Sequence, residues 1–181
     1  MSSKSSQPMH ETHPARAERG LTLIEILIAV VILSIGLLGL ASLQSTGLRF
    51  NQSAAMRSQA TILAYDMSDR MRANIDGVEA GDYLADSEAV PSAVGSCHTT
   101  GGCTVAEMAA DDIATWDAAA QRYLPGVEWI ICRDADPNDG TSLGDNECDG
   151  LATSPMAIKI WWDDNRDNVV DPDPFAVAFQ P

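Results

Sequence analysis

The chain opens with a polar segment and then changes abruptly to a long apolar one. Nearly every residue from 21 to 43 is apolar, and no charged residue occurs from Ile26 to Leu48. An α-helix rises about 1.5 Å per residue, so about 20 residues cross a hydrocarbon core about 30 Å thick. The pattern therefore predicts a membrane-spanning helix within residues 21–48.

An amphipathic pattern follows the apolar run and extends the predicted helix. No proline occurs between Leu48 and Pro91, and from residue 60 onward apolar residues recur at every fourth position. The recurring residues are Leu63, Met67, Met71 and Ile75, with Ala60 and Ala64 near them. This spacing places the apolar side chains on one face of a helix. We therefore predict that residues 49–76 continue the helix and pack this face on a folded domain.

Residues 77–181 have the composition of a small globular domain. Residues 77–102 are rich in Gly, Ser and Asp, which predicts a loop. Thr104 and Glu107 then form a capping box, in which the threonine hydroxyl and the glutamate carboxylate each satisfy a backbone amide of the other residue. The capping box predicts a second helix that begins there and ends before Pro125.

Three apolar runs rich in β-forming residues follow the second helix. They are Val127–Cys132, Met156–Trp162 and Phe175–Phe179. Runs of this length separated by polar segments are typical of strands. The predicted fold class is α+β, with a long N-terminal helix packed on a small domain that contains a second helix and an antiparallel sheet.

Four cysteines lie in the second half of the chain, at Cys97, Cys103, Cys132 and Cys148. An even number in a small domain behind a membrane segment indicates disulfides in an oxidising compartment. A zinc site is disfavoured because neither spacing is C-x-x-C. The sequence leaves three pairings open, of which the local one, Cys97–Cys103 with Cys132–Cys148, is the simplest.

The chain is strongly acidic, with a formal net charge of −15. Residues 1–20 hold three of the 11 basic residues and two of the 26 acidic ones, which leaves 8 basic and 24 acidic residues in the remainder. An acidic surface repels phosphate backbones. We therefore expect no nucleic-acid partner.

The sequence offers few groups for catalysis. His98 is the only histidine after residue 20, and it lies between Cys97 and Cys103 in a segment of Ser, Thr and Gly. A general base needs a proton donor within reach, and both neighbouring cysteines are predicted to be oxidised. No phosphate-binding glycine loop, nucleophile elbow or zinc-protease motif occurs. We predict no catalytic residues, no enzymatic activity and no cofactor.

Two acidic segments carry oxygen-bearing side chains at close spacing. The first begins like a calcium loop, with Asp134, Asp136 and Asn138 as candidate ligands. Its glycine, Gly140, comes one position late, and Asp145 stands where such loops have a glutamate. The second segment is 163–168. We interpret both as hydrated loops between strands and keep a membrane-anchored calcium or ligand-binding module as a rival hypothesis.

One acidic residue interrupts the start of the apolar run. Glu25 lies where an ionised carboxylate costs several kcal/mol unless a partner neutralises it. The basic residues that precede the run are Lys4, Arg16 and Arg19. They predict a cytoplasmic N-terminus and a domain on the far side of the membrane. A secretory signal peptide explains neither the length of the run nor Glu25, and a simple signal anchor leaves Glu25 unexplained.

The segment Arg19–Glu25, with sequence RGLTLIE, resembles the processing site of the type IV pilin and type II secretion pseudopilin family. The resemblance implies that residues 1–20 are a cytoplasmic leader, that a prepilin peptidase cuts between Gly20 and Leu21, and that the new N-terminus, Leu21, is methylated. It also implies that Glu25 pairs with the N-terminal amine of an adjacent subunit and sets the register of assembly. The family most often has Phe at the first mature position, where this chain has Leu21.

A looser resemblance to one branch of the family, the minor pilins of the PilV type, extends over the later segments. It rests on the stretches at 49–51, 65–74 and 107–112, on Trp116, on 124–126 and on 161–163. The resemblance implies a subunit of the inner membrane, and then of the cell-surface pilus, that helps prime assembly and supports adhesion and twitching motility. Its expected partners are other minor pilins, the major pilin, the prepilin peptidase and an adhesin at the pilus tip. A type II secretion pseudopilin is the alternative.

Overall fold

The computed structural model describes residues 22–180. Its first element, helix α1 (Leu23–Ala73), is 51 residues long and includes both the apolar run and the amphipathic segment. Residues up to Ser45 belong to one compact unit and those from Thr46 onward to a second, so each is described by itself.

In the first unit, the described residues form a helix that no other element covers. Every large apolar side chain from Leu23 to Leu43 is at least 50% exposed. By length and composition α1 is a candidate membrane span, with a mean hydropathy of 2.8 over its most apolar window. The exposed apolar surface thus has the character expected of a helix in a lipid or protein environment rather than in water.

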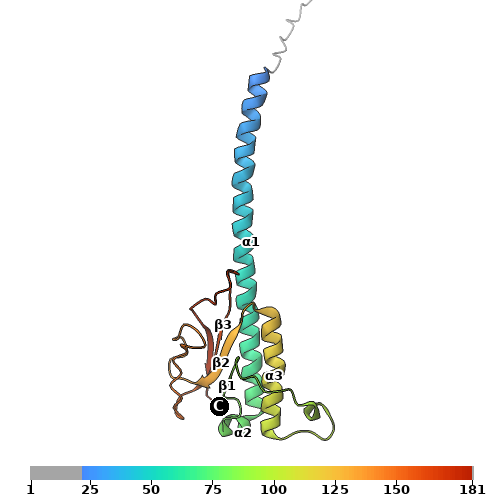
Figure 1. Ribbon diagram of the computed structural model, residues 1–181, viewed down its shortest axis with the longest axis vertical. Coiled ribbons are helices and arrows are strands. Elements are labelled where there is room, and N and C mark those ends of the chain that lie inside the picture. Colours follow the sequence, from blue (N-terminus) through green and yellow to red (C-terminus); the bar gives the residue numbers. More distant parts are fainter. Residues whose placement is uncertain (1–21, 181) are drawn as a thin grey trace, which may run out of the picture. The chain divides into compact units, whose positions relative to one another are not determined.

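The second unit is an α+β domain (Figure 1). Its helices besides α1 are α2 (Ile75–Ala80), the short 3₁₀ helix η1 (Gly95–His98) and α3 (Val105–Tyr123). Its strands are β1 (Ala85–Asp86), β2 (Glu128–Arg133), β3 (Met156–Trp161) and β4 (Phe175–Phe179). The strands form one sheet in the order β1-β2-β3-β4, in which all neighbours are antiparallel. The predicted fold class is confirmed.

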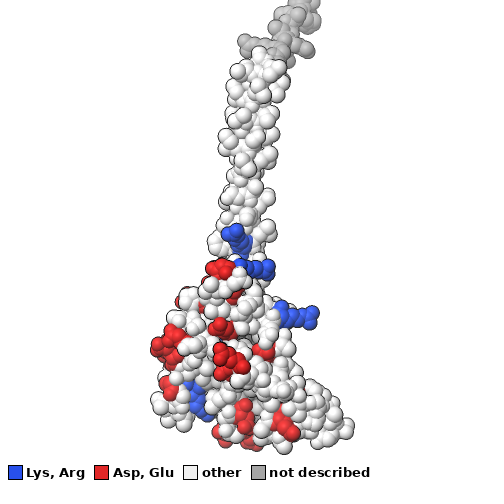
Figure 2. Space-filling view, in the orientation of Figure 1, with Lys and Arg blue, Asp and Glu red and all other residues white. Residues whose placement is uncertain are grey.

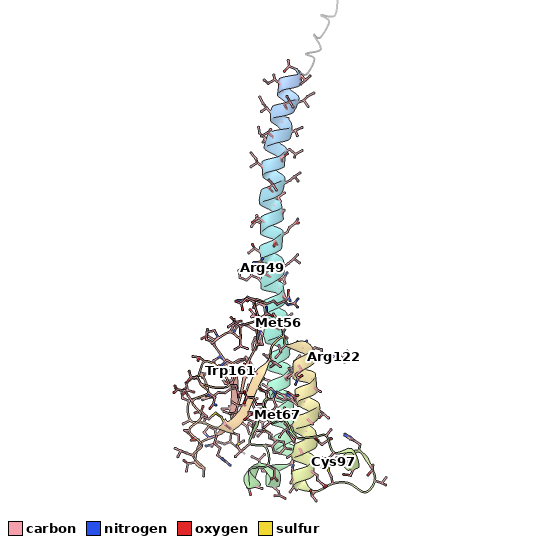
Figure 3. All side chains as sticks on the ribbon, in the orientation of Figure 1. Arg49, Met56, Met67, Cys97, Arg122 and Trp161 are labelled. Carbon is pink, nitrogen blue, oxygen red and sulfur yellow. A yellow bond between two sulfur atoms is a disulfide. The ribbon has the colours of Figure 1, made fainter. Side chains whose placement is uncertain are left out.

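The core of this domain lies where α1, α3 and the sheet meet. The residues of α1 that it buries are Met56, Ala60, Leu63, Ala64, Met67, Ser68 and Met71. At its centre Trp116 of α3 and Trp129 of β2 pack edge to face, with ring centroids 5.1 Å apart. Figure 3 labels Met56 and Met67 on α1. From β3 the residues Met156, Ile158 and Ile160 belong to the same core. The predicted helix face is therefore buried against the sheet and α3.

The predicted apolar stripe ends one turn earlier than expected. Ile75 is not part of α1, and it is 36% exposed. The helix stops because Asn74 leaves the helical conformation, with φ −126° and ψ 60°, and its side-chain amide donates 2.8 Å to the carbonyl of Val105. A side chain at position 77 would meet this amide, since a Cβ there would lie 2.7 Å from Asn74 Nδ2; Gly77 leaves the space free.

The prediction of a loop over residues 77–102 is wrong in part. This segment contains most of α2, the strand β1 and the helix η1. Strand β1 adds a fourth strand to the three predicted ones, and it pairs Ala85 with Ile131 and Asp86 with Ile130. A two-residue strand has too few positions to show an alternating pattern, and its place is set by the sheet that it joins.

The second predicted helix and the three predicted strands are confirmed. Helix α3 begins after Thr104, whose hydroxyl accepts from the amide of Glu107 at 3.3 Å while its own amide donates to Glu107 Oε2 at 2.8 Å. The capping box is therefore complete. Strand β4 has the predicted bounds, β2 is shifted by one residue toward the C-terminus, and β3 ends one residue earlier than predicted.

Candidate assembly site

The start of α1 carries the acidic residue that the sequence singled out. The amide of Glu25 donates to the carbonyl of Thr22 at 3.0 Å, so Glu25 lies in the first helical turn. A carboxylate is favoured there because helix N-termini carry partial positive charge. Glu25 is exposed, and no ion pair engages it within residues 22–180. The expected cleavage and methylation site at Gly20 and Leu21 lies outside the described residues.

The helix beyond Glu25 offers an apolar surface on all sides. Its one nearby hydroxyl, Ser34 Oγ, donates 2.7 Å to the carbonyl of Val30 and so is satisfied within the helix. At Gly36 and Gly39 the space that a side chain would fill is open. Small residues on an apolar helix let another helix approach closely. This surface can therefore pack against other apolar helices.

A polar network joins the end of α1, the turn after α2 and helix α3 in the domain. The buried Tyr83 hydroxyl donates 2.7 Å to Asp112 Oδ2, and Arg70 donates 3.1 Å to Asp112 Oδ1. Asn74 Nδ2 donates 3.2 Å to the same tyrosine hydroxyl. The segments 65–74 and 107–112, which carry the looser sequence resemblance, thus meet at one place.

The environment of Tyr83 keeps its hydroxyl protonated. Burial raises the pKa of Tyr83 well above its ordinary value, and the hydrogen bond to Asp112 raises it further. The hydroxyl is therefore a fixed donor at every physiological pH. Its hydrogen bonds hold the turn after α2 to the end of α1 and to α3.

Two tryptophan indoles anchor the helices and the sheet to each other. Trp116 Nε1 donates 2.7 Å to the carbonyl of Leu63 in α1, and Trp129 Nε1 donates 2.8 Å to Asp117 in α3. Both indoles are fully buried. If either acceptor were removed, water could not replace the lost hydrogen bond. The sequence gives no sign of the acceptor of Trp116, because Leu63 lies 53 residues away.

The four cysteines form two local disulfides, Cys97–Cys103 and Cys132–Cys148. This is the pairing that their spacing favoured. His98, which the sequence placed in a solvated loop, is largely exposed, but its Nε2 lies 2.9 Å from Oδ2 of the buried Asp111. The amide of Val94 binds the other oxygen of Asp111 at 2.8 Å. Asp111 thus ties the disulfide loop to α3.

The first calcium candidate is organised around a lysine that the sequence analysis did not single out. Lys159 of β3 is fully buried, and its ammonium lies 2.5 Å from Asp134 Oδ2 and 2.6 Å from Asp139 Oδ1. It also donates 2.7 Å to the carbonyl of Asn146. Of the other candidate ligands, Asp136 and Asn138 are exposed. The ammonium of Lys159 therefore occupies the position that a bound calcium ion would need.

One further grouping of metal-ligating residue types occurs among residues 22–180, and it offers no free thiolate. It consists of Cys132, Asp134 and Cys148. The two sulfurs are joined in a disulfide, and the carboxylate faces Lys159.

In the second acidic segment both oxygens of Asp163 accept backbone amides, those of Asp167 at 3.0 Å and Asn168 at 2.8 Å. These bonds shape a turn.

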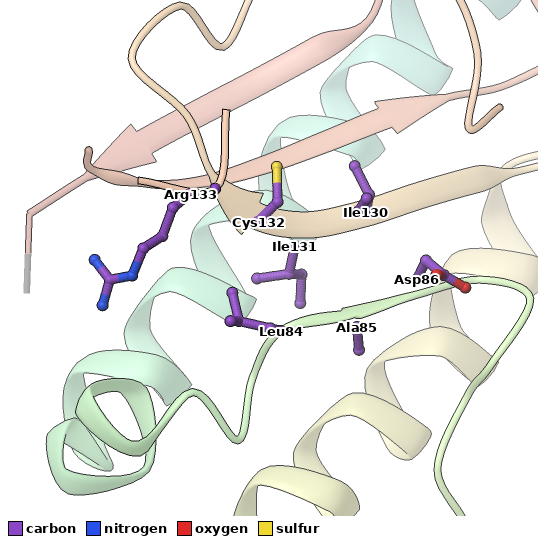
Figure 4. A pocket seen from close by; sticks show the side chains of 8 residues that line it. Leu84, Ala85, Asp86, Ile130, Ile131, Cys132 and Arg133 are labelled. Carbon is purple, nitrogen blue, oxygen red and sulfur yellow. The ribbon is translucent and has the colours of Figure 1, made fainter. Parts of the chain in front are cut away.

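A pocket of about 270 Å³ lies beside β1 (Figure 4). Its lining residues are Leu84, Ala85, Asp86, Ile130, Ile131, Cys132, Arg133 and Gly150. The carboxylate of Asp86 already accepts the amides of Glu88 and Ala89, at 2.9 and 3.0 Å. The lining is therefore mostly apolar, with Asp86 and Arg133 as its charged residues.

The features of the described residues fit the class of type IV pilin-like proteins. An apolar helix with one carboxylate in its first turn runs into an α+β domain that carries two disulfides. Comparison with family models agrees. The model of type IV pilin Tt1218 matches residues 42–114, and the model of the prokaryotic N-terminal methylation motif matches the adjoining residues 15–41. A search of curated proteins and a search of solved structures each found no match. Together the two models span residues 15–114, and they support a type IV pilin family for this chain.

Proposed function

We propose that this pilin-family chain is a minor pilin, a structural subunit that helps prime and assemble type IV pili and so supports adhesion and twitching motility. The observation that carries the proposal is the helix from Leu23 to Leu43, whose large apolar side chains are all exposed while Glu25 sits in its first turn. The looser resemblance of the domain segments to the minor pilin PilV favours this role over that of a major pilin.

The mechanism follows from the position of Glu25. Cleavage after Gly20 leaves a cationic amine on Leu21, four residues before the carboxylate. In an apolar environment such a carboxylate needs a cationic partner, and the amine of a neighbouring subunit provides one. A buried pair of this kind fixes register more than it adds stability. The exposed apolar surface then packs among other pilin helices.

The proposal is tested first at the N-terminus. The protein is isolated from membranes of cells with and without an active prepilin peptidase, and its intact mass and N-terminal sequence are measured. A mature chain that begins at Leu21, with or without one methyl group, supports pilin processing. A chain that keeps residues 1–20, or that begins near Ser42, contradicts it.

A second experiment separates the pilus from its nearest alternative, a type II secretion pseudopilin. A deletion strain is scored for surface pili, twitching and protein secretion. Loss of pili and twitching with normal secretion supports the minor pilin, whereas loss of secretion alone supports the pseudopilin.

A membrane-anchored calcium module predicts that calcium raises the melting temperature of the protein. The ammonium of Lys159 between Asp134 and Asp139 argues against that rival.

A further inference from the structure

Strand β4 forms one edge of the sheet and pairs with β3 alone. Outside this ladder, no hydrogen bond within residues 22–180 involves the backbone of Phe175–Phe179. An edge strand of this kind presents unpaired N–H and C=O groups on which another strand can form.

The register of the sheet identifies the unpaired groups. The amide of Asp134 donates 3.0 Å to the carbonyl of Pro155, so the odd-numbered residues along β3 direct their backbone groups toward β2. The even-numbered residues of β3 therefore face β4, where Ile158 pairs with Val177. It follows that the N–H and C=O groups of Ala176 and Ala178 point away from the sheet.

Strand β4 lacks the features that normally protect an edge. Phe175–Phe179 contains no charged residue and no proline, although Pro174 directly precedes it. The opposite edge is closed differently. There β1 lies beside β2 and covers two of its residues (Figure 4). The amide of Gly150 also donates 3.0 Å to the carbonyl of Arg133. The sheet is thus covered beside β2 and open beside β4.

We propose that the β4 edge binds an extended segment of a different pilus subunit, which adds a fifth antiparallel or parallel strand to the sheet. The inference rests on the proposed function, which supplies the setting of other subunits. Strand β4 is five residues long and is preceded by Pro174, so the contact is limited to a short segment. The side chains of Ala176 and Ala178 are small, so they leave room for large side chains of the incoming strand on that face.

The charge of the chain selects the occupant. Beyond residue 20 the chain has 24 acidic and 8 basic residues, and acidic side chains are spread over the face of the domain in Figure 2. Asp171 and Asp173 lie just before β4. A second copy would bring the same charges to the interface, and like charges across an interface oppose binding. The occupant is therefore a neutral or basic segment of another protein.

The test compares two substitutions at one position in the full-length protein, expressed from its own locus. Ala178→Pro removes the outward N–H but no β3–β4 hydrogen bond, and Ala178→Thr keeps the N–H as the matched control. We expect Ala178→Pro to lower surface piliation by about tenfold or more. A loss of about 1.4 kcal/mol at an interface weakens the binding constant by a factor of about ten. Ala178→Thr should match the wild type. Both variants should melt at the wild-type temperature in detergent.

Hydrogen exchange of the wild-type protein tests the same contact even if Ala178→Pro fails to fold. In membranes that contain the other pilus subunits, the amides of Ala176 and Ala178 should exchange at least about tenfold more slowly than in the protein alone, because strand pairing protects them. Equal exchange in both samples overturns the proposal. Protection in the concentrated protein alone also overturns it, because the occupant is then a second copy.

The deletion strain distinguishes this inference from the proposed function. If deletion leaves pili intact, the minor pilin function fails. If deletion abolishes pili while Ala178→Pro assembles normally and the Ala178 amide stays unprotected, the function stands and the β4 contact alone is overturned.

Discussion

Lys159 and Asp134 form an ion pair in the interior of the domain. The ammonium lies 2.5 Å from the carboxylate, and the two side chains are 0% and 3% exposed. Asp139 and the carbonyl of Asn146 provide further acceptors at 2.6 and 2.7 Å. Burial alone lowers the pKa of Lys159, but the hydrogen bonds and charges of Asp134 and Asp139 raise it above its ordinary value. The lysine thus acts as an internal cation for the loop between β2 and β3.

Replacing this cation should destabilise the domain strongly. Lys159→Met leaves Asp134 as a buried, unpaired carboxylate, so we expect the free energy of unfolding to fall by about 3–5 kcal/mol. Urea denaturation of the full-length protein in detergent measures the change. The double variant Lys159→Met with Asp134→Leu should recover most of the loss, because it removes the stranded charge as well. A single variant as stable as the wild type would show that the pair is hydrated.

The two disulfides should differ in their effect on stability. Cys132–Cys148 closes a loop with a sequence separation of 16, and Cys97–Cys103 closes one of 6. The entropy of loop closure gives about 3 kcal/mol for the longer loop and about 2 kcal/mol for the shorter one. We expect paired Cys→Ala substitution at 132 and 148 to lower the urea midpoint more than substitution at 97 and 103. The reverse order would mean that the loop held by Lys159 stays closed without its disulfide.

The regular elements were predictable because their signals are local. The apolar half of α1, the capping box at Thr104 and the strand Phe175–Phe179 each follow from a continuous stretch of sequence. The end of α1 was not predictable in this way. Asn74 ends the helix while its side chain donates a hydrogen bond to the carbonyl of Val105, which is 31 residues away. Strand β1 was missed for the same reason, since its pairing with β2 is set by the tertiary fold.

The candidate sites divide in the same way. The motif at Gly20 and Glu25 is a contiguous string and could be found by inspection. Lys159 could not, because in the sequence it is one basic residue within an apolar run, 25 positions after Asp134. Only the pairing of β2 with β3 brings the two together. An apolar strand that contains a single lysine is nevertheless a signal, because a buried lysine requires acidic partners.

The hydrogen bond from Trp116 to Leu63 should contribute to the attachment of α3 to α1. Trp116→Phe keeps an aromatic ring but removes the donor and leaves a small cavity, so we expect a loss of about 1–3 kcal/mol in the free energy of unfolding. Trp162→Phe is the control, because its indole reaches only Asp164 in a surface loop, at 3.2 Å. Equal losses in the two variants would assign the effect to ring volume rather than to the bond.

The cap of α3 predicts a pH dependence of stability. Hydrogen bonds from the backbone and then the hydroxyl of Thr104 lower the pKa of Glu107. Because the folded-state pKa is depressed, the stabilisation is present above the unfolded-state pKa and is lost as the pH falls through the folded-state pKa. The urea midpoints of wild type and Glu107→Gln should therefore differ at neutral pH and converge in acid.

A second variant controls for general charge effects in this comparison. Glu79 of α2 is exposed and has no hydrogen bond from its side chain in the described part of the chain. Glu79→Gln should leave the urea midpoint unchanged relative to wild type at every pH. If the difference in urea midpoint between wild type and Glu107→Gln were the same in acid as at neutral pH, the effect could not be assigned to the carboxylate.

Glu25 supplies the sharpest test of assembly. Glu25→Gln keeps the size of the side chain and removes its charge, so membrane insertion and cleavage should continue while pairing with a neighbouring amine is lost. An amine left unpaired in an apolar environment costs about 3 kcal/mol or more, so the fraction of the protein recovered in sheared pili should fall by more than about tenfold. Glu25→Asp, which keeps the charge on a shorter side chain, should retain part of the assembly. The measurement is an immunoblot of the sheared and membrane fractions. Full assembly of the Gln variant would mean that the apolar surface alone sets the register.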